Sequence, residues 1–320
     1  MAKSTRIMTR TSLLLVAAVA LLGCTSNGKG PQTPAGATGP AGSTFPEPTS
    51  TGQFTSAANV KVAYPARVAT AGAMTFVSDA AGNQVVGTGP AGTIVLGGLD
   101  KPLGIAVAGD RLYVGNAGRQ DVEIYALGQQ QYLRSLGGQG AFLMPNAIAV
   151  ASDGTVAVAD SKQNLVQLYS AAGAHLATLG GQGTDNGKFN FPSAVAIDDT
   201  RIVVGDQGNH RVQIFDRKGA FVAAFGSEVT GGKSRDDYKG KFTRIAGVAL
   251  AGANIYVLDS AHAYVQVLDG AGNWQGFLGS SGDCASCMKL GLDVAVAADG
   301  SVLVTDPENR RVVTLSPELR

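Results

Sequence analysis

Apolar positions along the chain come in short runs that follow one another in a fixed order. In one stretch, an apolar run at 192–197 is followed by a turn and by a second run at 201–206. A polar turn and two further runs, at 212–215 and 221–226, complete the unit. Short runs bounded by Gly, Asp and Asn are typical of β-strands, and none of these runs has the period of an amphipathic helix. The pattern therefore predicts a unit of four short strands.

The same unit occurs six times. Its second run ends in Asp or Asn, at positions 79, 116, 160, 206, 259 and 306, which are 37, 44, 46, 53 and 47 residues apart. Four-stranded units that repeat every ~40–50 residues are typical of the blades of a β-propeller. The first run of each unit is small and apolar (VATA, IAVA, IAVA, AVAI, VALA and VAVA), as strands crowded around a central axis require. We therefore expect an all-β fold, a six-bladed β-propeller with four-stranded antiparallel blades.

The fourth unit carries a motif that can be compared with a known family. Its Asn209-His210-Arg211 step, three residues after Asp206, resembles an NHL repeat. The sixth unit keeps Asp306 and Arg311 in the same layout, and the resemblance extends in weaker form over about residues 60–320. It implies an NHL-type propeller in which the repeated polar residues are structural. We expect their side chains to satisfy buried backbone groups between turns and blades; these residues are Asp160, Asp206, Asn209, His210, Arg211, Asp259, Asp306 and Arg311.

The first residues predict export. A basic start (Lys3, Arg6, Arg10) precedes the apolar run 13–23, which is shorter than the ~20 residues that span a bilayer as a helix. Residues 21–24 (LLGC) resemble the lipobox of bacterial lipoproteins, which implies that 1–23 is a signal peptide and that Cys24 is lipidated. The alternative is an ordinary signal peptide with a chance cysteine. Thr25 after the cysteine favours the outer membrane of the cell envelope.

Two further segments complete the organisation. Residues 24–52 are dominated by Gly, Pro, Ser and Thr and predict a disordered linker behind the lipidated cysteine. The propeller is assigned to 53–320. Its last unit stops at 320 without a fourth strand, whereas residues 53–63 are left over before the first unit. We therefore expect 53–63 to complete the last blade and close the ring.

Net charge bears on possible partners. The 25 Lys and Arg and 24 Asp and Glu become 22 and 24 once residues 1–23, with three positive and no negative charges, are removed. A nearly neutral exported chain gives no support for a nucleic-acid partner.

Histidines and cysteines are the candidate chemical residues. The three histidines (His175, His210, His262) fall in strand-linking turns of separate units, and the axial runs contain no His, Glu or Cys, so we expect no metal site and no cofactor. Cys284 and Cys287 form a C-x-x-C motif. Met288 in place of His disfavours c-type haem attachment. A local disulfide is the favoured reading in an oxidising compartment, and a reactive or metal-binding pair is the alternative.

Loop lengths indicate which face of the propeller is the binding face. Turns between first and second strands are tight, whereas connections between units are long, and in a propeller these connections share a face with the Asp-containing turns. The longest, 227–244, is also the most charged, and it is either a solvated insertion or a contact patch. Its candidate binding residues are Lys233, Arg235, Asp236, Tyr238, Lys239 and Lys241.

The sequence thus favours a membrane-tethered, non-catalytic propeller scaffold that binds another exported protein or a surface glycan. Two alternatives stay open. NHL-like propellers include metal-dependent lyases and hydrolases, so an exported lyase or lactonase-type enzyme is one. A redox partner that uses Cys284 and Cys287 is the other.

Overall fold

The structure is a computed structural model that describes residues 53–56, 60–138, 140–232 and 234–315. The predicted signal peptide, Cys24, the linker and Lys233 lie outside the described residues. Among the described residues, no helix has the length and apolar character needed to cross a bilayer.

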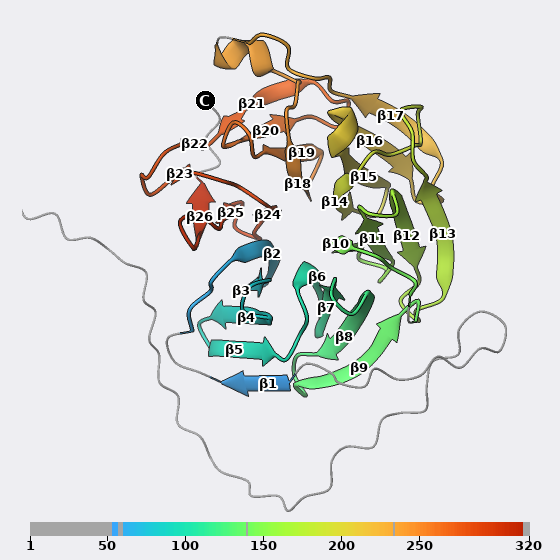
Figure 1. Cartoon of the computed structure of the whole chain (residues 1–320), viewed down its shortest axis with the longest axis vertical. Helices are drawn as coiled ribbons and strands as arrows, with labels where there is room; N and C mark the ends of the chain where they lie inside the picture. Colours follow the sequence, from blue (N-terminus) through green and yellow to red (C-terminus); the bar gives the residue numbers. More distant parts are fainter. Residues whose placement is uncertain (1–52, 57–59, 139, 233, 316–320) are drawn as a thin grey trace, which may run out of the picture.

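Six sheets stand around a central axis, each with its first strand innermost, so the expected six-bladed propeller is confirmed (Figure 1). Blade one contains β2 (Pro65–Ala71), β3 (Met74–Asp79), β4 (Gln84–Gly89) and β5 (Gly92–Gly97). Blade two contains β6 (Pro102–Ala108), β7 (Arg111–Asn116), β8 (Asp121–Ala126) and β9 (Gln131–Leu136). Blade three contains β10 (Pro145–Val150), β11 (Val156–Asp160), β12 (Leu165–Tyr169) and β13 (His175–Gly180).

The remaining blades follow the same antiparallel order. Blade four contains β14 (Pro192–Ile197), β15 (Arg201–Asp206), β16 (Arg211–Asp216) and β17 (Phe221–Phe225), with the 3₁₀ turn η1 (Gln207–Asn209) between β15 and β16. Blade five contains β18 (Ile245–Ala251), β19 (Asn254–Asp259), β20 (Tyr264–Leu268) and β21 (Trp274–Leu278). The described part of blade six has three strands, β24 (Val294–Val296), β25 (Val302–Asp306) and β26 (Arg311–Leu315).

The core lies between neighbouring blades, and the inter-blade loops contribute to it. Phe189 and Phe242 precede the first strands of blades four and five and are fully buried. Gly180 and Gly226 end the preceding blades with φ of +103° and +110°, and a Cβ on either would lie within 3 Å of the phenylalanine ring. Glycine is therefore required there twice over, for its backbone conformation and for the space it leaves. The loops are fixed to the scaffold by these rings.

The assignment of residues 53–63 to the last blade is wrong for the strand they form. β1 (Gln53–Ser56) pairs antiparallel with β5 and adds a fifth, outermost strand to blade one. Phe54 lies opposite Leu96 and packs edge-on against Tyr125 at 5.8 Å. The physical reason is that β5 offers an unpaired edge next to apolar side chains of blades one and two, which satisfies the backbone and buries Phe54 together.

Candidate functional site

Asp206 holds the loop that enters blade four. Its carboxylate accepts hydrogen bonds from the backbone N–H of Asn190 (2.7 Å), the amides of Asn209 (2.8 Å) and Gln213 (3.1 Å), and the Arg211 guanidinium (2.8 Å). It is completely buried, so these donors replace the water that the charge has lost. The polar turn and the incoming loop thereby become one rigid unit.

Equivalent carboxylates do the same in other blades. Asp160 accepts from the backbone N–H groups of Leu143 and Met144, and Asp259 from those of Thr243 and Arg244. Asp306 accepts weakly from Lys289 and Leu290. The face of the propeller that contains these Asp turns and the inter-blade loops is called the anchor face below.

Arginine and histidine of the NHL-like motif extend this network. Arg211 donates to the carbonyls of Asp185 and Lys188 within the loop before blade four, while His210 Nδ1 lies 3.1 Å from the carbonyl of Thr243 in the loop before blade five. His210 has φ +53°, so its ring is delivered by a left-handed turn residue. Its partner is a backbone group in the loop before the next blade.

In blade two, the buried carboxylate and the buried amide have exchanged positions relative to blade four. Asn116 stands where the other blades have Asp, and Glu123 stands where blade four has Gln213. Asn116 donates to Glu123 at 2.7 Å, and Arg119 pairs with Glu123 at 2.9 Å. Asp121, in the position of Arg211, is buried; burial and the neighbouring Glu123 raise its pKa to about 7. The buried carboxylate has thus moved from the second strand to the third.

At the axis, one arginine reaches across the propeller. Arg67 extends from β2 of blade one and donates to backbone carbonyls of four other blades; its acceptors are Asn146 (2.8 Å), Ser193 (2.8 Å), Ala246 (2.8 Å) and Leu292 (3.1 Å). Its guanidinium also pairs with Asp293 at 3.1 Å. Both side chains are largely buried, and burial raises the pKa of Asp293 although Arg67 acts against it.

Arg67 is a prominent residue of the axial site that the sequence analysis did not identify. Blades two to five place Gly104, Ala147, Ala194 and Gly247 at its position in the first strand, and blade six places Asp293, the residue before β24, there. A Cβ on Gly247 would approach Asp293 to about 3.0 Å. The available signal was a pair of opposite charges at matching positions of the first and last units. Beyond this pair, the axial strands line a channel of about 260 Å³ with small aliphatic side chains.

The long loop 227–244 folds back onto blade five. Its 3₁₀ turn η2 (Arg235–Tyr238) starts with a capping box in which Ser234 and Asp237 bond to each other's backbone N–H. Tyr238 stacks on His262 at 4.3 Å, and His262 stacks on Tyr264 at 5.6 Å. The loop is therefore ordered by its own caps and by an aromatic stack on its blade.

The predicted binding residues of this loop divide into two groups. Arg235 and Tyr238 are half-buried, and the Arg235 guanidinium lies 4.5 Å from the Phe277 ring centre. The exposed members are Asp236, Lys239 and Lys241; Lys239 pairs with Asp236 at 2.7 Å and its ammonium lies 4.5 Å from the Trp274 ring centre. Lys241 is the other exposed lysine of this group.

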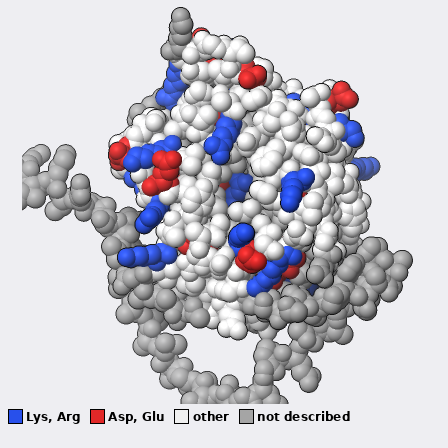
Figure 2. All heavy atoms as spheres, viewed as in Figure 1, with Lys and Arg blue, Asp and Glu red and all other residues white. Residues whose placement is uncertain are grey.

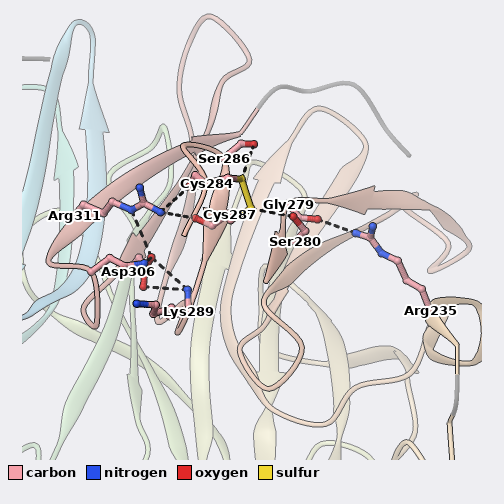
Figure 3. Close-up of a disulfide and its surroundings, with 10 residues drawn as sticks. Arg235, Gly279, Ser280, Cys284, Ser286, Cys287, Lys289, Asp306 and Arg311 are labelled. Atoms are coloured by element: carbon pink, nitrogen blue, oxygen red, sulfur yellow. Dashed lines mark hydrogen bonds and ion pairs between the residues drawn. A yellow bond between two sulfur atoms is a disulfide. The ribbon is translucent and has the colours of Figure 1, made fainter. Parts of the chain in front are cut away.

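Cys284 and Cys287 form a disulfide in the loop between blades five and six (Figure 3). The short strands β22 (Ser280–Ser281) and β23 (Cys287–Met288) pair in parallel beside it. Arg311 from blade six donates to the carbonyls of both cysteines at 2.9 and 2.8 Å. On the other side, Arg235 donates to the carbonyl of Gly279 at 2.9 Å, as Figure 3 shows. The disulfide segment 279–288 is thus connected to loop 227–244.

Charges over the surface are mixed. On the face seen in Figure 2, Lys and Arg are scattered together with Asp and Glu over a mostly uncharged surface, and neither sign forms a large patch. Within the described ranges, no group of three or more His, Cys, Asp or Glu is arranged to hold a metal ion.

Comparison with known proteins agrees with this geometry. The family model described as NHL repeat matches residues 189–215, from the loop before blade four through β16. No curated protein matches the chain. Among solved structures, it resembles "Kuenenia stuttgartiensis Hydrazine Synthase" (TM-score 0.58, 14% identity, covering 82% of this chain and 99% of that one).

Two lyase structures have the same fold. A structure titled "Streptogramin B lyase structure" gives a TM-score of 0.56 at 10% identity, covering 83% of this chain and 98% of that one. The virginiamycin B lyase from Staphylococcus aureus gives 0.58 at 9% identity, covering 83% and 88%. Likeness at this identity shows the fold alone. The chain is a six-bladed β-propeller. More particularly, it is a propeller with an NHL repeat in its fourth blade.

Proposed function

We propose that this protein is an exported, lipid-anchored recognition module that binds another exported protein or a surface glycan through its anchor face. Cys24 and the linker 25–52 would tether the propeller to the envelope while leaving its orientation free. Outer-membrane attachment is part of the same proposal.

The observation that carries the proposal is the ordering of residues 234–244 in the long loop. Its capping box and its stack on His262 fix the loop before any partner arrives, and Lys239 and Lys241 stay exposed on it. A loop that is already ordered loses little conformational entropy on binding, so more of the contact energy appears as affinity. A solvated insertion has no need of such order.

An exported enzyme is the second candidate, because lyases share the fold. Arg67 argues for recognition instead. Its guanidinium lies on the axis at the anchor face, where its N–H groups donate to the protein's own carbonyls and to Asp293. The mouth of the channel on this face is therefore filled by protein. Stoichiometric Zn or Ca in elemental analysis of the purified protein would favour the enzyme.

A cross-linking pull-down from membranes tests recognition. The variant Lys241→Glu changes an exposed charge of loop 227–244, and Lys218→Glu makes the same change in the tight turn of blade four on the opposite face. We expect Lys241→Glu to lower partner recovery at least about fivefold and Lys218→Glu to leave it unchanged. Equal recovery with both variants, at equal abundance and thermal stability, would reject this loop as the contact site.

A further inference from the structure

The two sulfurs of the disulfide lie in different environments. Cys284 is exposed on the anchor face, whereas Cys287 is only 8% exposed and lies in β23. A thiolate attacks a disulfide along the S–S axis and needs access to one sulfur only. The surface therefore offers Cys284 as the sulfur that is attacked and Cys287 as the one that leaves.

The leaving sulfur has a hydrogen-bond donor in place. Ser280 Oγ lies 3.3 Å from Cys287 Sγ across the β22–β23 pair. A disulfide sulfur carries no proton, so the serine hydroxyl must be the donor. The same hydroxyl would stabilise the negative charge that forms on Cys287 when the S–S bond breaks.

Two cations and two carboxylates lie in or next to the segment. Arg311 is held against the carbonyls of Cys284 and Cys287, and Lys289 follows Cys287 by two residues. The acidic neighbour Asp283 is neutralised by Lys289 at 2.6 Å. Arg311 also pairs with Asp306 at 3.6 Å, so these charges balance and the Ser280 hydroxyl is the group that favours a thiolate on Cys287.

The turn does not depend on the disulfide for its position. The backbone N–H of Gly282 donates to the carbonyl of Met288 at 3.2 Å, and that of Cys287 to Cys284 at 3.1 Å. Arg311 and the β22–β23 pair add further bonds. The cross-link closes a turn that other contacts already hold, so its opening leaves the scaffold intact. An exposed sulfur, a hydrogen-bond donor for the leaving sulfur and a turn held by other contacts suit a disulfide that forms and breaks as part of the protein's function.

We propose that Cys284–Cys287 is a thiol–disulfide exchange site whose co-reactant is a dithiol of another exported protein. A partner thiolate attacks Cys284 Sγ, forming a mixed disulfide, and the S–S electron pair leaves on Cys287 as a thiolate stabilised by Ser280. The second thiolate of the partner then attacks its own sulfur in the mixed disulfide and releases Cys284. The partner is oxidised to a disulfide by two electrons, and Cys284 and Cys287 are reduced to thiols. This inference rests on the export in the proposed function and is independent of its recognition role.

Reduction of the full-length protein by dithiothreitol, followed by mass spectrometry after thiol alkylation, tests the proposal without a partner. The rate should rise in proportion to dithiothreitol concentration in the folded protein. Ser280→Ala should slow it about three- to tenfold, Ser280→Thr should restore it, and Ser281→Ala, which changes the adjacent exposed serine, should stay within twofold of the parent. Oxidised glutathione added to the reduced protein should form its transient adduct on Cys284, best trapped in Cys287→Ser.

Two results would overturn the exchange site. One is a reduction rate that levels off at the rate of unfolding, which means that only the unfolded chain reacts. The other is identical behaviour of Ser280→Ala and Ser281→Ala, which means that the serine hydroxyl does nothing for the leaving sulfur. Loss of partner capture in Lys241→Glu with normal exchange, or the reverse, separates this proposal from recognition.

Discussion

Arg67 in β2 and Asp293, the residue immediately before β24, occupy matching positions in blades one and six and meet at 3.1 Å on the propeller axis. They lie 226 residues apart in the chain, yet their blades are neighbours in the ring. Asp293 also accepts from the backbone N–H of Val68 at 3.0 Å, and Thr305 donates to the carbonyl of Ala66 at 3.2 Å. Among the described residues, blade six contains no strand from the start of the chain, so these contacts join the two ends of the ring.

Loss of Arg67 should therefore destabilise the whole ring. Arg67→Ala leaves the Asp293 carboxylate buried without its cation and removes a donor from four carbonyls in other blades. We expect the free energy of unfolding to fall by about 3–5 kcal/mol, the range for breaking a buried ion pair. Urea unfolding followed by far-UV circular dichroism measures it.

Controls distinguish this pair from ordinary surface charge. Lys162→Ala, at an exposed lysine, should change stability by less than about 0.5 kcal/mol. The double variant Arg67→Ala/Asp293→Ala should be less destabilised than the sum of the singles, because no buried charge is left over. Additive effects would mean that the two side chains do not act as a pair.

The exchanged amide and carboxylate of blade two can be tested by substitutions that restore the arrangement of blade four. Asn116→Asp would place two carboxylates at a spacing of 2.7 Å, opposite Glu123. We expect a loss of about 1–3 kcal/mol from like-charge burial. Adding Glu123→Gln recreates the Asp–Gln arrangement of blade four and should recover most of that loss in thermal unfolding. A double variant as unstable as Asn116→Asp would show that the two positions are not interchangeable.

Asp121 should make stability depend on pH. Its folded pKa of about 7 exceeds the ordinary value of 3.8, so the folded state binds the proton more tightly than the unfolded chain does. The stabilisation of the folded state by this tighter proton binding is fully present below pH ~3.8 and is lost as pH rises through ~7. Asp121→Asn cannot ionise and should stabilise the protein by about 1–3 kcal/mol at pH 8, with little effect near pH 4. Glu308→Gln, at an exposed position, is the control and should show no such difference between the two pH values.

Much of the fold could be predicted from residues with a local role. The repeated Asp before a polar turn marks the end of a second strand because the carboxylate bonds to that turn and to the loop beside it, as Asp160 and Asp206 do. Such spacing is visible in one sequence. The Cys284–Cys287 disulfide was predictable for the same reason, since both partners lie within one turn.

Features that depend on contacts between distant segments could not be read in this way. The role of Arg67 is visible only when carbonyls of four other blades and the Asp293 carboxylate come together around it. The pairing of β1 with β5 depends on which sheet edge is open, and sequence pattern does not say which edge lies nearest. The half-burial of Arg235 and Tyr238 follows from the aromatic surface of blade five, whose residues are spread over separate strands.

Membrane attachment gives the last prediction. If Cys24 is lipidated, its thiol carries the acyl chains that anchor the chain, and each buried CH₂ contributes ~0.8 kcal/mol to membrane binding. Cys24→Ser should move the protein from the membrane fraction to the soluble fraction and abolish labelling by an alkyne fatty acid. The propeller should be unaffected, because its described contacts begin at residue 53, and its melting temperature provides the control. A Cys24→Ser protein that still sediments with membranes and is still labelled would require a different anchor, whereas labelling lost without release would mean that the anchor face itself holds a membrane-bound partner.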